Sequence, residues 1–121
     1  MQITRRVLLA VVASLPALPA FGHHGWRWTA QGKFELTGVI TQARLGNPHG
    51  VLTVDADGEL WQVEVGQPWR NTRAGLQDSM LAPGVEIVAL GLRSADESQK
   101  IMKAERVVIA GQNYDLYPDR L

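Results

Sequence analysis

The stretch that decides the fold is VLTVDADGELWQVEV, residues 51–65. Apolar and polar residues alternate on both sides of Asp57-Gly58, which is the pattern of two half-buried β-strands. Asp and Gly tolerate the positive φ angles of a tight primed turn, so an Asp-Gly pair between two alternating runs is a strong hairpin signal. The sequence therefore predicts an antiparallel hairpin over 51–65, with Trp61 on its apolar face.

The flanking sequence predicts further strands and one short helix. A long strand rich in Thr, Val and Ile runs over 34–45 and contains Gly38, which suggests a bulge or a bend. After the hairpin, Asn71 or Thr72 is the expected cap of a short helix that extends to Leu81. Strands follow over 85–92, 101–110 and 113–117, with turns between them.

The order of these elements is three strands, a helix, and two or three strands. This is the order of the OB fold, a small Greek-key barrel that is closed or partly open. We therefore expect a mostly β domain, an OB-like barrel of five to six strands with one short helix between strands three and four. Trp61 and Trp69 are expected in its core, Trp69 beneath the helix.

The first 22 residues have the order of a cleavable signal peptide. Arg5 and Arg6 precede an apolar run over 7–18, and Ala20-Phe21-Gly22 places small residues at the positions that signal peptidase reads. The apolar run is shorter than the roughly 20 residues that a membrane-spanning helix needs. The sequence thus predicts a signal peptide over 1–22 and a mature domain over 23–121, with no membrane span after cleavage.

These features predict a periplasmic or secreted protein. The Arg5-Arg6 pair resembles a twin-arginine signal, but paired arginines are common in ordinary secretory signals, and we favour the general secretory route. There is no cysteine, which excludes disulfides, thiolate nucleophiles and thiolate metal sites. Without Arg5 and Arg6, ten basic residues face twelve acidic ones, a net charge of −2. This balance argues against nucleic acid as a partner.

All three histidines fall in the mature domain. His23 is the predicted new N-terminus, whose α-amine and imidazole can bind one metal ion together, and His24 or His49 can add a third nitrogen. Nitrogen ligands of this kind suit Cu(II) and then Zn(II). If cleavage follows Ala20 instead, His23 becomes the third residue, which is also a copper-binding arrangement. The other interpretation is a solvated chain end and a histidine that completes a turn. Both interpretations stay open.

The loop over 46–50 follows the first strand, where OB barrels have part of their usual binding face. Two tryptophans precede that strand, and they either line a ligand groove or close one end of the barrel. The candidate contacts for a ligand or partner are therefore Trp26, Trp28, Asn47 and Pro48.

The chain resembles DUF6152, a family of small exported bacterial proteins of unknown function. The resemblance is carried by His23-His24-Gly25-Trp26, by Asn47-Pro48-His49 and by Tyr114-Asp115-Leu116-Tyr117-Pro118. It covers nearly the whole mature chain. It implies export and an OB-like β fold, and it implies no activity.

The sequence contains no serine elbow, no glycine-rich phosphate loop and no carboxylate pair outside turns and loops. We therefore predict no catalytic residue and expect a non-enzymatic protein. Two functions stay open. The first is a periplasmic binding or accessory module that acts through its loops on a small ligand or on another exported or membrane protein. The second is a periplasmic copper- or zinc-binding protein that uses His23, His24 and His49.

Overall fold

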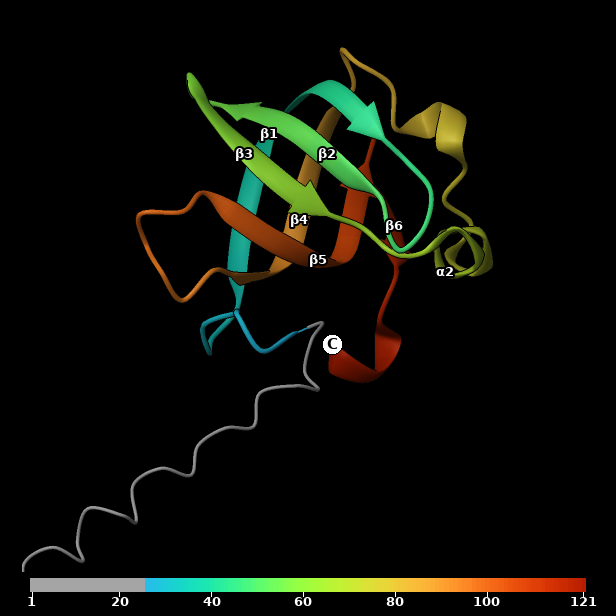
Figure 1. Cartoon of the computed structure of the whole chain (residues 1–121). Helices are drawn as coiled ribbons and strands as arrows, with labels where there is room; N and C mark the ends of the chain where they lie inside the picture. The colour runs from blue at the N-terminus through green and yellow to red at the C-terminus, as the bar shows by residue number, and fades with distance from the viewer. Residues whose placement is uncertain (1–25) are drawn as a thin grey trace, which may run out of the picture.

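The computed structural model describes residues 26–121, which form a six-stranded sheet that closes into a barrel (Figure 1). β1 pairs antiparallel with both β2 and β4, β2 pairs with β3, and β4 pairs with β5. β3 then pairs in parallel with β5 and closes the barrel, and β6 extends the sheet beyond β5. This arrangement confirms the predicted OB-like barrel. The strands are β1 (Phe34–Arg44), β2 (Val51–Ala56), β3 (Glu59–Glu64), β4 (Glu86–Arg93), β5 (Ile101–Ile109) and β6 (Gln112–Asp115).

The predicted hairpin is formed by β2 and β3. Its turn residues Asp57 and Gly58 have φ angles of 55° and 87°, as a primed two-residue turn requires. The Asp55 carboxylate accepts a hydrogen bond of 2.8 Å from the Gly58 backbone N–H and holds the turn closed. Trp61 is 5% exposed, so it lies in the core as predicted.

β1 bends close to the glycine that suggested a bend. Its pairing with β2 changes register between Ile40 and Gln42, just beyond Gly38. Gly38 itself serves the close approach of β2, because a Cβ atom there would lie 2.4 Å from the Asp55 carbonyl oxygen. The strand curves enough at this point to pair with β2 and with β4 at once.

The helix α2 (Pro68–Ala74) begins and ends earlier than the sequence predicted. Pro68 fits the first helical turn, because its fixed φ and missing N–H cost nothing there. Gly75 ends the helix with a φ of 88°, and a separate 3-10 turn, η2 (Asp78–Met80), follows. Neither helix nor 3-10 turn within residues 26–121 is long and apolar enough to cross a membrane.

Two side chains of α2 also differ from expectation. Asn71 is no cap: its buried side chain accepts a hydrogen bond from the Gly66 N–H and donates one to the Gly66 carbonyl. Trp69 is 52% exposed and does not lie beneath the helix. The segment that follows the helix packs against the barrel, and its Leu76 and Leu81 side chains are each 1% exposed.

β5 is covered on both of its faces. Met102 and Ala104 point into the core, and Lys103 and Glu105 point the opposite way, because side chains alternate along a strand. Lys103 and Glu105 are nevertheless only 5% and 1% exposed. They are covered by the segment before β1 and by the segment after β6, which lie on the same side of the barrel (Figure 1). The candidate site lies where these two segments meet.

Candidate binding groove

A cavity of about 510 Å³ opens beside the loop between β1 and β2. We call this cavity the loop groove. Its walls come from the lead-in to β1, the β1–β2 loop, the end of β3, the start of α2, the middle of β5 and the C-terminal segment. The residues that line it are Trp26, Trp28, Pro48, His49, Glu64, Gln67, Arg70, Lys103 and Tyr117.

The structure brings together four of the seven residues that the sequence singled out, namely Trp26, Trp28, Pro48 and His49. Asn47 does not line the loop groove; it lines a shallower depression of about 270 Å³ along the same loop, together with Pro48 and His49. The remaining two residues are His23 and His24, which lie outside the described part of the chain.

The β1–β2 loop is fixed to the end of β3 by backbone hydrogen bonds. The Gly50 N–H donates to the Gly66 carbonyl at 3.1 Å, and the Val65 N–H donates to the Gly50 carbonyl at 2.9 Å. These bonds place His49 beside the last residue of β3. His49 Nε2 lies 3.3 Å from Glu64 Oε1, and the histidine side chain is 30% exposed. His49 therefore faces the groove and does not enter the core.

A buried lysine forms the floor of the loop groove. Lys103 Nζ lies 3.5 Å from Glu64 Oε1, the same oxygen that His49 approaches. The ammonium also lies 5.2 Å from the centroid of the Trp26 ring and 5.8 Å from that of Tyr117. The negative faces of the two rings and the Glu64 carboxylate together compensate the positive charge of a side chain that is 6% exposed.

Trp26 and Tyr117 form a ridge along one side of the loop groove. Their rings meet edge to face at a centroid distance of 5.0 Å, and we call the pair the aromatic ridge. The Arg120 guanidinium lies 3.8 Å from the Trp26 ring centroid, and that of Arg70 lies 4.1 Å from the Tyr117 centroid. Burial raises the pKa of the Tyr117 hydroxyl, and the Arg70 charge offsets part of this effect. The hydroxyl therefore stays protonated as a hydrogen-bond donor at neutral pH.

A family model describes most of this chain. The model of a family of unknown function, DUF6152, matches residues 10–103. The chain belongs to DUF6152. No curated protein sequence matches this DUF6152 chain.

Solved structures resemble this DUF6152 domain in fold. A ZRD-deleted mutant of TiaS in complex with agmatine superposes with a TM-score of 0.51 and 14% identity, over 69% of this chain and 26% of TiaS. A chain of the S. pombe Stn1–Ten1 complex gives a TM-score of 0.47 and 18% identity, over 66% of this chain and 59% of its own length. The DUF6152 chain thus corresponds to less than two thirds of either protein.

The described part of the DUF6152 domain, residues 26–121, contains no group of three histidine or carboxylate side chains that could hold a metal ion. His49 and Glu64 are two candidate ligands, but the Lys103 ammonium shares the Glu64 oxygen and opposes a second cation there.

Sequence reasoning missed five of the residues that line the loop groove. Alternation along β5 predicts Lys103 on a solvated face, and no short-range pattern indicates that the segments before β1 and after β6 cover it. Arg70 belongs to α2, which begins earlier than the sequence predicted, and Gln67 is the residue just before that helix. Tyr117 lies in the Tyr114–Pro118 segment, whose sequence we compared with DUF6152, but this segment is beyond residues 10–103 that the family model matches. The five residues are Glu64, Gln67, Arg70, Lys103 and Tyr117.

Proposed function

We propose that this protein is an exported binding or accessory module whose loop groove holds a small ligand or a segment of a partner protein. One observation carries the proposal: segments far apart in the sequence converge on one cavity that has aromatic walls and a buried charged floor. Binding sites are typically concave, with apolar or aromatic walls and a few polar groups that fix the orientation of the ligand.

The chemistry of the groove supports recognition of a ligand with both polar and flat apolar parts. The aromatic ridge and Trp28 offer apolar surface. His49, Gln67 and the Tyr117 hydroxyl can exchange hydrogen bonds with a ligand. Export supports a partner in the periplasm or in the membrane that faces it, and it rests on the predicted signal peptide, which lies outside the described residues.

Site-specific photo-cross-linking in cells tests this function. We would place benzoylphenylalanine at Trp28 or Pro48, and at Leu60 as the control, because Leu60 is 61% exposed on the β2–β3 hairpin and lines no part of the loop groove. We expect a discrete adduct from positions 28 and 48 and none from position 60. The intact mass of the adduct separates a small ligand from a partner protein. Absence of adducts at both groove positions, or equal yields at all three, would overturn the proposal.

A second candidate function is periplasmic binding of Cu(II) or Zn(II) by His23, His24 and His49. The observation that favours it is that Trp26 and His49 line the same cavity. His24 is two residues before Trp26, so the extended chain cannot carry its Cα more than about 7 Å from that of Trp26. The proposal therefore requires only a short connection between His24 and the groove that His49 faces.

Titration of the protein from the periplasm with Cu(II), after its N-terminus is verified by mass spectrometry, tests this candidate. We expect tight one-to-one binding that His49→Ala weakens at least tenfold, equivalent to about 1.4 kcal/mol. Asn47→Ala is the matched control in the same loop and should leave the affinity unchanged. Affinity that His49→Ala does not alter would mean that the N-terminal peptide binds copper alone, without a folded site.

A further inference from the structure

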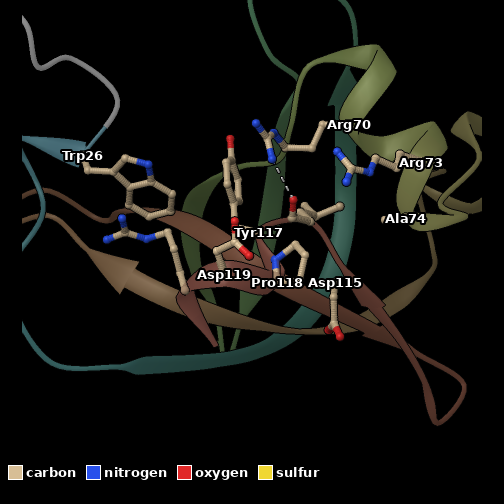
Figure 2. A pocket seen from close by; sticks show the side chains of 10 residues that line it. Trp26, Arg70, Arg73, Ala74, Asp115, Tyr117, Pro118 and Asp119 are labelled. Carbon is tan, nitrogen blue, oxygen red and sulfur yellow. Dashed lines mark hydrogen bonds between the residues drawn. The ribbon is translucent and has the colours of Figure 1, made fainter.

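A second cavity lies on the other side of the aromatic ridge. It has a volume of about 450 Å³ and lies between α2 and the C-terminal segment (Figure 2). Trp26, Arg70 and Tyr117 line both this cavity and the loop groove, whereas Arg73 and Asp119 line only this one. We call it the arginine cavity. An inference about it does not depend on whether the loop groove has a ligand.

Two of the five charged side chains that line the arginine cavity have ion-pair partners. Arg120 Nε lies 2.9 Å from Glu105 Oε2, and Asp115 forms a bidentate pair with Arg106. Within residues 26–121, three further charged side chains of the cavity have no ion-pair partner, and they leave it with a net charge of +1. They are Arg70, Arg73 and Asp119.

Arg70 is held in place with donors to spare. Its Nη1 donates to the Leu116 carbonyl at 3.2 Å, its Nε approaches Gln67 Oε1 at 3.4 Å, and its guanidinium is 4.1 Å from the Tyr117 ring centroid and 4.5 Å from that of Trp69. A guanidinium has five N–H donors, so most of those on Arg70 remain available. Because the protein already fixes this side chain, a ligand that binds it loses little further side-chain entropy.

Arg73 completes a pair of arginines on one face of α2. Residues three apart on a helix are neighbours on its surface. Figure 2 shows both side chains directed from α2 towards the C-terminal segment, with Tyr117 between them and Trp26. Arg73 has no hydrogen-bond partner among the described residues. The planar fork of a guanidinium matches the two oxygens of a carboxylate.

We propose that the arginine cavity binds a monoanionic carboxylate ligand with a flat apolar body. Arg73 and Arg70 would donate hydrogen bonds to the carboxylate, and the edge of the aromatic ridge would contact the flat body. The Asp119 carboxylate argues for a monoanion, because it repels a second negative charge and the net charge of the cavity is only +1. A phosphate dianion is therefore the disfavoured ligand.

NMR titration of the ¹⁵N-labelled protein with three probes tests this site. Benzoate carries a carboxylate on a flat ring, benzamide is its neutral analogue, and inorganic phosphate is the dianion. We expect saturable benzoate-dependent shifts at Arg73 Nε and at the Trp26 indole N–H, and benzamide binding at least tenfold weaker. Benzamide binding equal to that of benzoate, or phosphate binding tighter than that of benzoate, would contradict the proposal.

Substitution of two exposed arginines, one at a time, distinguishes benzoate binding in this cavity from non-specific attraction to positive surface charge. Arg73→Gln should weaken benzoate binding at least fivefold. Arg44 lines neither cavity, so Arg44→Gln removes the same charge elsewhere and should change the affinity for benzoate by less than twofold. Asp119→Asn should tighten benzoate binding. Benzoate binding unchanged in Arg73→Gln would overturn the proposal. Because Arg73 does not line the loop groove, that result would leave the proposed function untouched.

Discussion

At the scale of the residue, the informative side chains are the two charged ones that β5 directs away from the core. Lys103 and Glu105 would be solvated on an ordinary barrel, but here the chain ends cover them. Glu105 accepts hydrogen bonds from Lys33 and from Arg120, and its side chain is 1% exposed. A carboxylate buried in this way is tolerated because each of its oxygens has a cationic partner.

We predict that Glu105→Ala destabilises the protein by about 2–3 kcal/mol, at or below the lower end for breaking a buried ion pair, because Lys33 and Arg120 are both partly exposed and regain water. The C-terminal segment would also lose the ion pair between Arg120 and Glu105, while its backbone hydrogen bonds to β5 remain. Urea unfolding measures the first effect, and the NMR resonance of the Trp26 indole N–H, which lies beside Arg120, reports the second. Glu86→Ala, at an exposed position of β4, is the control and should change the free energy of unfolding little. Equal losses in the two variants would contradict this account of Glu105.

At the scale of the element, the position of α2 depends on a local clasp. Asn71 makes two hydrogen bonds to Gly66, at 2.9 Å to its N–H and at 3.0 Å to its carbonyl. Gly66 follows β3, so the clasp fixes where the helix leaves the barrel and thus where Arg70 and Arg73 lie. The clasp also needs the glycine, because a Cβ atom at position 66 would lie 2.8 Å from Asn71 Oδ1.

We predict that Asn71→Ala lowers the free energy of unfolding by about 2 kcal/mol, because it leaves the buried Gly66 N–H without a partner. It also removes one of the two hydrogen bonds to the Gly66 carbonyl, which keeps the bond from the Gly50 N–H. Thermal or urea denaturation gives this value. Asn113→Ala, at an exposed position of β6, is the matched control and should cost less than about 0.5 kcal/mol. If Asn71→Ala changed the free energy of unfolding as little as the control, water would be replacing the hydrogen bonds of Asn71, and other contacts would hold α2 in place.

At the scale of the whole molecule, the first described residues lie beside the last ones, next to the loop groove. Trp26 is packed against Tyr117 and Arg120, so the described chain already begins beside the C-terminal segment. The proposed export and the proposed metal binding both concern residues before Trp26, which lie outside the described part of the chain.

We predict that the protein recovered from the periplasm begins at His23, with Phe21 as the alternative start if cleavage follows Ala20. Intact-mass analysis of the periplasmic and the membrane fractions distinguishes these starts from the uncleaved chain. Arg5→Lys together with Arg6→Lys should leave export intact, because the general secretory route requires positive charge and not a pair of arginines. Protein that keeps Met1 in every fraction would contradict the predicted signal peptide.

The sequence by itself determined the barrel. Alternation, the Asp57-Gly58 turn and the order of strands and helix are short-range features, and they predicted the β2–β3 hairpin and the OB-like topology. Local reasoning failed at α2, where Pro68 and Gly75 set the ends, and at Trp69, which faces solvent. Four of the predicted site residues proved to share one cavity.

Only the tertiary structure decided what covers the outer face of β5. Lys33 and Glu105 are 72 positions apart, and Trp26 meets Tyr117 from the opposite end of the described chain. Such contacts follow from barrel closure, which carries the two ends of the chain to the same strand. The aromatic residues of each segment indicate burial, but no local pattern specifies which strand or which residues they cover. The floor of the loop groove, the aromatic ridge and the arginine cavity all exist because of that long-range packing.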